Sequence, residues 1–272
     1  MVLSWKLQAS NYLVLINTGD ISYARFSVAG SRCHTTMADQ VSTTSPPAAP
    51  PPRGEQFAEV VVVRHGETSW NASRIIQGQM DPELNETGRR QALVVARRLS
   101  REPKPAAVYS SDLRRAAETA QIIATACGVS NPVLDPALRE RHMGDLHGLV
   151  FDDAVRRNPE IFSSDGRTRT QEIPGGGESL DQLSRRCVSY LNTVAEKHKG
   201  ERVIVVTHGA STEELCLHAD PTSPVRGKLH NTSICLFRIG GGEWILEKAG
   251  DVAHLGQGGF LEDAFGGDAA SA

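Results

Sequence analysis

The stretch VVVVRHG (residues 60–66) places four consecutive valines directly before an arginine, a histidine and a glycine. A run of β-branched residues is typical of a strand that is buried on both faces, as in a parallel sheet flanked by helices. A second stretch, VIVVTHG (residues 203–209), repeats this pattern. Because ligands of open α/β sheets bind at the carboxyl ends of the strands, the two stretches predict that His65 and His208 share one cleft.

Strand and helix patterns alternate through the rest of the chain. Further strands are predicted at residues 106–111, 232–239 and 243–249, and helices at 85–101, 112–128, 178–200 and 211–219. In the helix at 85–101, Leu93, Val94 and Leu99 are expected to face the core. Together these patterns predict an α/β fold, a three-layer α/β/α sandwich with a mostly parallel central sheet and a short cap insertion before residue 178.

The chain has 272 residues, with 29 basic and 32 acidic side chains and a formal net charge of −3. This balance gives no overall attraction to nucleic acid or to an anionic membrane, and no apolar run is long enough to span a bilayer. The five cysteines include no C-x-x-C pair, which favours reduced thiols over a disulfide framework or a zinc site. We therefore expect a cytoplasmic protein with neither nucleic acid nor membrane as a partner.

The first 56 residues differ from the rest. Residues 42–56 hold five of the fourteen prolines, which predicts an extended linker. Residues 1–36 contain a single acid, Asp20, and either form an unstructured leader or target the chain to a plastid or mitochondrion. Met37 could itself be a translation start. We expect three parts: a disordered leader and linker (1–56), a folded domain (57–255) and a flexible tail (256–272).

A third strand end adds two arginines. The stretch YSSDLRRA (residues 109–116) brings Arg114 and Arg115 to the start of a predicted helix, whose N-terminus favours anions. A guanidinium group offers a planar fork that matches two phosphoryl oxygens and stays charged. Together with Arg64, His65 and His208, these residues predict a site for a phosphoryl group.

Five motifs extend this pattern: RHGETSWN (64–71), LNETGRRQA (84–92), YSSDLRRAAETA (109–120), LRERHMGDLHG (138–148) and VTHG (206–209). In order and spacing they resemble the histidine phosphatase superfamily, also called phosphoglycerate mutase-like. The resemblance covers nearly all of the predicted domain. It looks closest to the small phosphatase branch that is often named phosphoglycerate mutase-like in plants, and it implies neither a metal nor a cofactor.

The resemblance implies a role for each matching residue. His65 would be the nucleophile and carry a phosphohistidine intermediate. Arg64, Arg115 and His208 would bind the phosphoryl oxygens and stabilise charge in the transition state. Of the two adjacent arginines, Arg115 matches the motif because it directly precedes AAET, so Arg114 is expected to point elsewhere.

Glu140, in LRERHMG, would protonate the leaving alkoxide and then help to activate water; its alternative is a plain surface ion pair. Asn71, Gln77 and Gly78, in WNASRIIQG (residues 70–78), lie where family members add phosphate contacts, although such residues also serve in turns.

Phosphatase and mutase activity are both open to this family. Mutases need a phosphorylated cofactor and usually carry a longer cap, whereas a short cap leaves a phosphohistidine open to water. The sequence therefore favours a metal-independent phosphomonoesterase without a cofactor, with a cofactor-dependent phosphoglycerate mutase as the alternative. A catalytically silent phospho-ligand binding module is the alternative from another class, and the presence of all five site residues argues against it.

The cap segment (residues 162–179) contains Arg167 and Arg169. These arginines could bind a second anionic group of the substrate, such as a carboxylate. The expected substrate is then a small metabolite such as phosphoserine or a phosphoglycerate. The alternative is that both arginines are solvated on a loop. The GGGE run (residues 175–178) is expected to lead into the following helix rather than to hold a phosphate. The closing strands could pair with a second copy of the chain in a homodimer.

Overall fold

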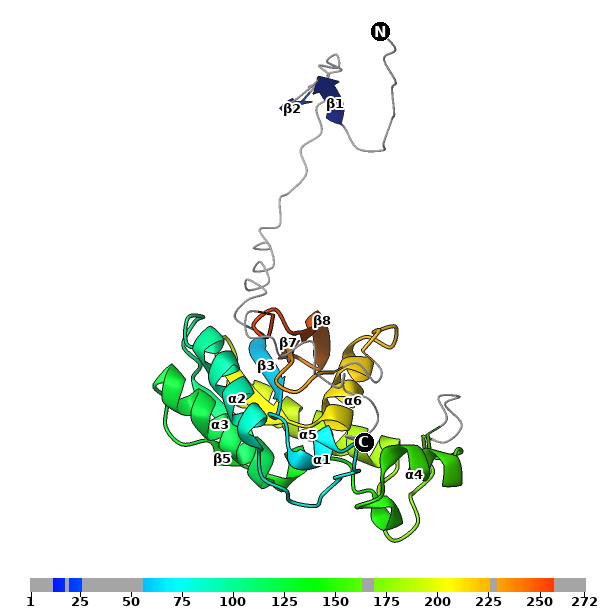
Figure 1. Ribbon diagram of the computed structural model, residues 1–272. Helices are drawn as coiled ribbons and strands as arrows, with labels where there is room; N and C mark the ends of the chain where they lie inside the picture. Colours follow the sequence, from blue (N-terminus) through cyan, green and yellow to red (C-terminus); the bar gives the residue numbers. More distant parts are fainter. Residues whose placement is uncertain (1–11, 18–19, 26–55, 163–168, 226–228, 257–272) are drawn as a thin grey trace, which may run out of the picture. The chain divides into compact units, whose positions relative to one another are not determined.

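The computed structural model describes residues 12–17, 20–25, 56–162, 169–225 and 229–256 (Figure 1). The chain divides into two compact units, residues Met1–Ala48 and Ala49–Ala272. In the first, strands β1 (Tyr12–Asn17) and β2 (Asp20–Arg25) form an antiparallel pair inside the segment that we predicted to be a disordered leader. Almost all of the other leader, linker and tail residues lie outside the described ranges, so the three predicted parts stay a prediction.

The second unit is built on a six-stranded sheet with the order β5-β4-β6-β3-β7-β8. Its strands are β3 (Ala58–Arg64), β4 (Ala107–Ser110), β5 (Val133–Leu134), β6 (Arg202–Thr207), β7 (Ile234–Gly240) and β8 (Glu243–Asp251). The first four strands in that order are parallel, while β7 and β8 run antiparallel to their neighbours. The predicted mostly parallel sheet is confirmed; β5 escaped prediction because two exposed residues carry no pattern.

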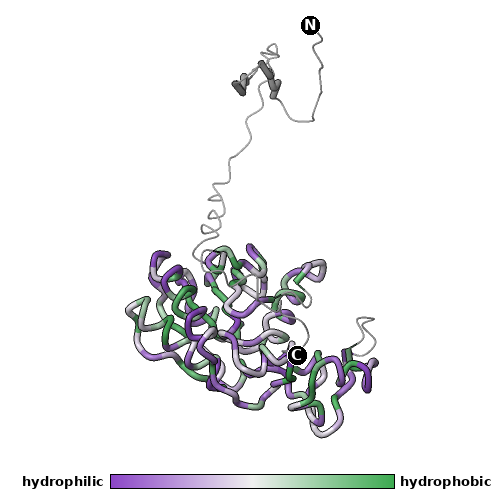
Figure 2. The backbone as a smooth tube through the Cα atoms, viewed as in Figure 1, coloured by the Kyte–Doolittle hydropathy of each residue, from purple (hydrophilic) through white to green (hydrophobic). Residues whose placement is uncertain are grey.

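Four long helices cover the sheet: α2 (Glu86–Leu99), α3 (Arg114–Cys127), α5 (Leu180–Lys197) and α6 (Gly209–Ala219). Successive side chains of a strand point to opposite faces, so the valine run of β3 serves both layers. Val61 and Val63 pack with α2 and α3, whereas Val60 and Val62 pack with α5 and α6 (Figure 1). Apolar and hydrophilic residues alternate along the outer helices (Figure 2). The α/β/α sandwich is therefore confirmed.

The prediction for the buried face of α2 was wrong at two positions. Leu93 is 47% exposed and Val94 is only half-buried, while Val95 and Leu99 are buried. The buried stripe also includes the small residues Gly88, Ala92 and Ala96. Small side chains let α2 lie close to its neighbours. This close packing, rather than the size of an individual apolar side chain, decides which face of α2 is buried.

Gly88 lies where α2 meets the loop that follows β3. A Cβ atom at this position would be 2.0 Å from the carbonyl oxygen of Glu67. Alanine normally stabilises a helix by about 1 kcal/mol relative to glycine. Here we expect Gly88→Ala to lower the free energy of unfolding by roughly 1–3 kcal/mol, because the backbone must move. Urea denaturation beside the exposed control Arg90→Ala checks this, and a stabilised Gly88→Ala variant would contradict it.

The cap has a small core of its own beyond the sheet. Its helices are α1 (Ser69–Ala72) and α4 (Phe151–Arg157). The apolar core of the cap consists of Ile76, Met143, Leu146, Ala154, Ile161 and Ile173. A backbone hydrogen bond from Ile76 to Leu149 joins the segment after α1 to the segment before α4. The cap core is therefore one packed cluster formed by the segment after α1, the acid motif and the segment that leads to α5.

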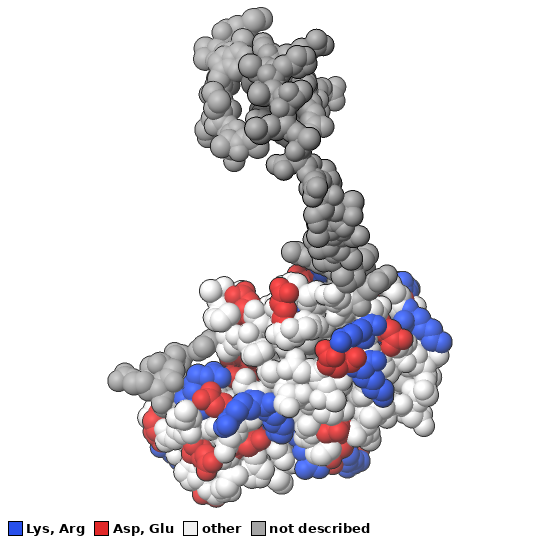
Figure 3. All heavy atoms as spheres, turned by 180° about the vertical axis from the view of Figure 1, so that it is seen from behind, with Lys and Arg blue, Asp and Glu red and all other residues white. Residues whose placement is uncertain are grey.

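The surface charges agree with the balanced composition of the chain, and the described thiols are free. Basic and acidic side chains are interspersed on the face shown in Figure 3. Cys187, Cys216 and Cys235 are buried free thiols and Cys127 is a half-buried one, while Cys33 lies outside the described ranges. Among the helices that could be searched, none is both long and apolar enough to cross a membrane.

Candidate active site

The two predicted histidines meet at the carboxyl ends of neighbouring strands. Arg64 of β3 pairs with Thr207 of β6, and the backbone N–H of His65 donates to the Thr207 carbonyl at 2.9 Å. Their positions bring the His65 and His208 rings to a centroid distance of 5.1 Å. Both side chains are buried. The structure therefore confirms that the two strand endings bring His65 and His208 together.

Hydrogen bonds give the His65 ring a defined orientation. Its Nδ1 lies 2.7 Å from the carbonyl oxygen of Gly66, which can only accept, so Nδ1 carries the proton. Its Nε2 accepts from Nε of Arg115 at 3.3 Å and therefore holds the lone pair. Burial, and then the charges of Arg115 and Arg64, hold the pKa of His65 well below its ordinary value. A neutral imidazole with its lone pair on Nε2 is the form that can attack phosphorus.

Arg115 is buried and fixed by two backbone carbonyls. It donates to Gly78 at 2.7 Å and to Met80 at 2.8 Å. Burial lowers its pKa to about 10, against the raising effect of the Glu140 charge, so it remains a cation at neutral pH. The neighbouring Arg114 lies at the surface and pairs with a glutamate at 3.0 Å, as predicted.

Arg64, at the end of β3, is also buried and donates to the Leu229 carbonyl. Its charge contributes to lowering the pKa values of His65 and His208. Two guanidinium groups thus lie beside the two imidazoles, which gives this strand edge a concentration of positive charge suited to a phosphoryl group.

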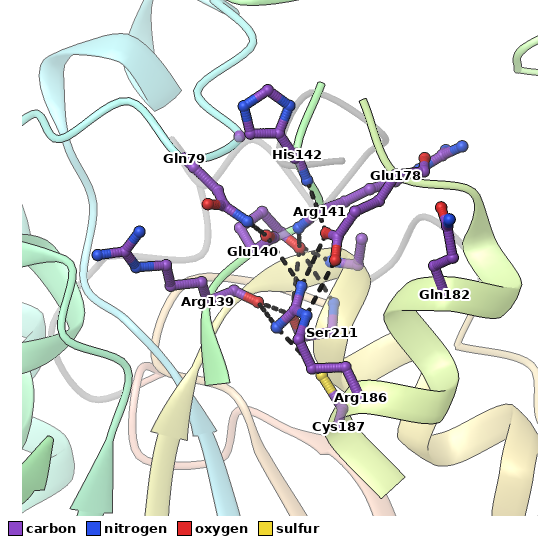
Figure 4. Close-up of polar contacts among 12 residues, drawn as sticks. Gln79, Arg139, Glu140, Arg141, His142, Glu178, Gln182, Arg186, Cys187 and Ser211 are labelled. Carbon is purple, nitrogen blue, oxygen red and sulfur yellow. Dashed lines mark hydrogen bonds and ion pairs between the residues drawn. The ribbon is translucent and has the colours of Figure 1, made fainter. Parts of the chain in front are cut away.

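Glu140 lies at the N-terminus of α6 and is 1% exposed. One carboxylate oxygen accepts from the backbone N–H of Arg141 at 2.8 Å and of Ser211 at 3.2 Å, and the other accepts from Ala210 at 3.1 Å (Figure 4). Burial raises its pKa, although these N–H donors and the nearby arginines oppose the shift. The alternative of a surface ion pair is wrong, and a buried carboxyl with a raised pKa suits a proton donor.

Asn71, Gln77 and Gly78 lie in the first turns after the His65 loop. Asn71 accepts from the backbone N–H of Thr68, and the Thr68 hydroxyl donates to Gln77 Oε1 at 2.9 Å. Gly78 has φ of 45° and provides the carbonyl that holds Arg115, so its part in the site is to position that arginine.

Within the site, two of the buried side chains named so far have polar atoms without hydrogen-bond partners among the described residues. These atoms are Nε2 of Gln77 and both ring nitrogens of His208. Buried polar atoms nearly always have a partner, and an exception calls for an explanation. An oxyanion bound between His208 and the arginines would accept from the one ring N–H that a neutral His208 carries.

The two cap arginines have different outcomes. Arg167 lies outside the described residues. Arg169 forms a bidentate pair with the buried Glu214, with nitrogen–oxygen distances of 3.1 and 2.5 Å, and also pairs with Asp181. Its guanidinium is therefore held by protein carboxylates in this structure. The GGGE run leads into α5 through the capping residue Ser179, as predicted.

Sequence reasoning missed several uncharged residues that hold the site. Thr119 accepts from the backbone N–H of Gly66 at 3.1 Å, and Asn231 donates to the His65 carbonyl at 3.0 Å. Thr232, with φ of 58°, donates its backbone N–H to the Arg64 carbonyl. Thr119 stands inside the motif AAETA and could have been singled out, whereas nothing in the sequence marks Asn231 or Thr232.

The family model for the histidine phosphatase superfamily (branch 1) matches residues 60–252. The chain belongs to the histidine phosphatase superfamily. Phosphoglycerate mutase-like protein 4 of Arabidopsis thaliana is 52% identical over 217 residues, which cover 79% of this chain and 94% of the relative. The metal-independent phosphoserine phosphatase of Arabidopsis thaliana is 46% identical over 215 residues, which cover 79% of this chain and 90% of that protein.

A solved structure, that of YhfR from Bacillus stearothermophilus, has the same fold as this histidine phosphatase superfamily chain. It aligns with a TM-score of 0.65 and 31% identity, covering 73% of this chain and 99% of YhfR. Both the sequence and the fold therefore support the reading of the site as that of a phosphatase. Within the described part of the chain, no group of three or more His, Cys, Asp or Glu residues could hold a metal ion.

The electrostatics of the two histidines predict their titration. The pKa of each is held well below the ordinary value, mainly by burial and then by the Arg115 charge. At pH 6.5, where an ordinary histidine is about half protonated, both rings should be neutral. Nitrogen NMR of the ring atoms, assigned with His65→Ala and His208→Ala, measures this, with a histidine peptide as the reference. Titration of either ring at the peptide's pH would contradict the prediction.

The same shifts link stability to pH. Below about pH 6.5 the unfolded chain binds protons at these two positions that the folded chain does not, so their contribution to stability falls as pH falls.

Proposed function

We propose that this chain hydrolyses small phosphomonoesters through a phosphohistidine on His65, without a metal ion. The observation that carries this proposal is the buried His208 ring, whose nitrogens have no hydrogen-bond partner among the described residues. This ring lies beside the His65 nucleophile and the two buried arginines. Such a cluster of cations and hydrogen-bond donors suits the charge that develops on a transferring phosphoryl group. The name of the metal-independent phosphoserine phosphatase relative supports the absence of a metal requirement.

The first step transfers the phosphoryl group to the enzyme. Nε2 of His65 forms a bond to phosphorus as the bond to the ester oxygen breaks. Arg64, Arg115 and His208 bind the phosphoryl oxygens during this transfer. Protonated Glu140 gives its proton to the departing alkoxide, which leaves as an alcohol.

The second step releases inorganic phosphate. The Glu140 carboxylate takes a proton from a water molecule as the water oxygen bonds to phosphorus and the bond to His65 Nε2 breaks. His65 returns to its starting form, and Glu140 is again protonated. A short cap favours this attack by water over return of the phosphoryl group to a second hydroxyl.

The proposed substrate is phosphoserine or a phosphoglycerate. One curated relative is a phosphoserine phosphatase, and we propose the same substrate class here. Arg167 and Arg169 are the cap residues proposed to bind the substrate carboxylate. Of the two, Arg169 is the weaker candidate, because its guanidinium already pairs with Glu214. The rate of phosphate release from phosphoserine should be compared with that from a phosphoester without a carboxylate in the Arg167→Ala/Arg169→Ala double variant. If these arginines bind the carboxylate, only the rate for phosphoserine falls.

Phosphoglycerate mutase activity is the second candidate, because one relative is named phosphoglycerate mutase-like protein 4. The full chain should be assayed with phosphoserine, 3-phosphoglycerate and p-nitrophenyl phosphate in the presence of a chelator. Phosphate release that survives chelation is the expected result. Release of no phosphate, together with conversion of 3-phosphoglycerate to 2-phosphoglycerate when a bisphosphoglycerate is added, would favour the mutase. No reaction in either assay would favour a silent binding module.

A further inference from the structure

Arg186, on α5, binds the backbone just before the proposed acid and the carbonyl of the acid itself. Its Nη1 donates to the carbonyls of Ala137 and Arg139, both at 2.9 Å, and its Nη2 donates to the carbonyl of Glu140 at 3.3 Å (Figure 4). The same guanidinium pairs with the carboxylate of Glu178 through bonds of 2.9 and 2.8 Å. A single side chain thus holds three carbonyls of the segment that carries Glu140.

Glu178 extends this hold to the residues after the acid. Its carboxylate accepts from the backbone N–H of His142 at 2.9 Å, and its own N–H donates to the His142 carbonyl at 2.8 Å. Its carbonyl accepts from the Arg141 side chain at 2.8 Å. The pair of Arg186 and Glu178 therefore fixes the backbone from residue 137 to residue 142 against α5.

The position of the Glu140 carboxyl depends on this backbone. The carboxyl bonds the first N–H groups of α6, so it lies between a helix end and a segment that Arg186 holds from another helix. All the carbonyls that Arg186 contacts belong to residues 137–140. Without the guanidinium each carbonyl keeps one other donor: the Cys187 thiol at 3.7 Å for Ala137, the Ser211 hydroxyl at 3.0 Å for Arg139 and the Gln79 amide at 3.1 Å for Glu140. The segment loses the single charged donor that ties all three carbonyls to α5, so it can move relative to α6.

We propose that Arg186 is a positioning residue that sets the Glu140 carboxyl at the distance from which it protonates the leaving group. This inference rests on the proposed phosphatase function. Arg186 acts through Glu140 and takes no part in binding the phosphoryl group. A displacement of about 1 Å of a catalytic group can cost as much as 10²-fold in rate.

The choice of leaving group distinguishes positioning of the acid from general structural support. Phosphoserine loses a poor leaving group that needs a proton, whereas p-nitrophenyl phosphate loses a stable phenolate that needs little help. We expect Arg186→Met to lower kcat/KM for phosphoserine about 10-fold more than kcat/KM for p-nitrophenyl phosphate, because kcat/KM reports the first transfer, before the two esters share one phosphohistidine. The matched control is Arg185→Met, because the neighbouring Arg185 is exposed and donates only to a carbonyl within α5.

Arg186→Lys keeps the positive charge and serves as a second variant should Arg186→Met fold poorly. It should show the same selective loss to a smaller degree, because an ammonium group cannot reproduce the fork. Equal losses on both esters, in whichever variant folds with a wild-type Tm, would overturn the proposal. A wild-type chain that hydrolyses neither ester would overturn the proposed function, and this inference with it.

Discussion

The His65→Ala variant should release phosphate at least ~10⁴-fold more slowly than the wild type, since loss of a covalent nucleophile is among the costliest single changes in an enzyme. The Nε2 lone pair of His65 is the nucleophile that the structure brings beside both arginines. No neighbouring group can replace it: the centroid of the His208 ring lies 5.1 Å from that of His65, just beyond the end of strand β6. The loss should be equal for esters of good and poor leaving groups, because both need the attack on phosphorus.

Phosphate release by His65→Ala is to be measured beside His218→Ala, which removes a histidine that packs on Trp244 near the C-terminus of α6, at the end away from the site. The Tm of both variants shows whether the fold survives. Activity in His65→Ala within about 10-fold of the wild type would contradict a phosphohistidine route, since even one acid–base group contributes 10²–10⁴-fold.

The Glu140→Gln variant should hydrolyse phosphoserine about 10²- to 10⁴-fold more slowly, the range typical of a general acid–base group. Glutamine keeps the size of the side chain and one carbonyl oxygen for the α6 N–H groups, but it has no proton to give. For p-nitrophenyl phosphate kcat/KM should fall much less, because kcat/KM reports the first transfer, in which the phenolate leaves unprotonated; the later attack of water is common to both esters. Steady-state kcat/KM on the two esters measures the difference, and equal losses of kcat/KM would show that Glu140 is not the acid.

The raised pKa of Glu140 also predicts a pH dependence. Burial favours the protonated carboxyl, so the acid form persists to a higher pH than for an ordinary glutamate. For phosphoserine, kcat/KM of the wild type should fall as pH rises through that pKa, because the proton is lost from the donor. In Glu140→Gln this alkaline decline should be absent, and its persistence would assign the decline to another group.

Local patterns predicted the strand ends of the site. The valine runs fix two buried strands, and each leads directly into a histidine, so the placing of His65 and His208 follows from the rule for parallel sheets. The family motifs separated Arg115 from Arg114, and the structure places the first inside and the second at the surface. Site features that depend only on a short segment and on the neighbouring strand could therefore be predicted.

Features that depend on distant contacts could not be predicted in this way. Leu93 was expected inside because it is large and apolar, but the stripe of small residues on α2 faces the core instead. Arg169 was expected either to bind a substrate carboxylate or to be solvated on a loop, yet its partner Glu214 lies on α6, 45 positions away. Asn231 reaches the His65 carbonyl across 166 positions. No periodicity records such pairings, because they arise only when the layers pack.

The most direct test of the account is to trap the phosphorylated enzyme. Wild-type chain is mixed with phosphoserine, quenched in alkali, where phosphohistidine survives, and digested for mass spectrometry. The account predicts a phosphoryl group on His65 alone, lost on brief exposure to acid and absent from His65→Ala. Turnover of the ester with no phosphorylated residue, or with the phosphoryl group on a different side chain, would contradict the central claim that His65 is the nucleophile.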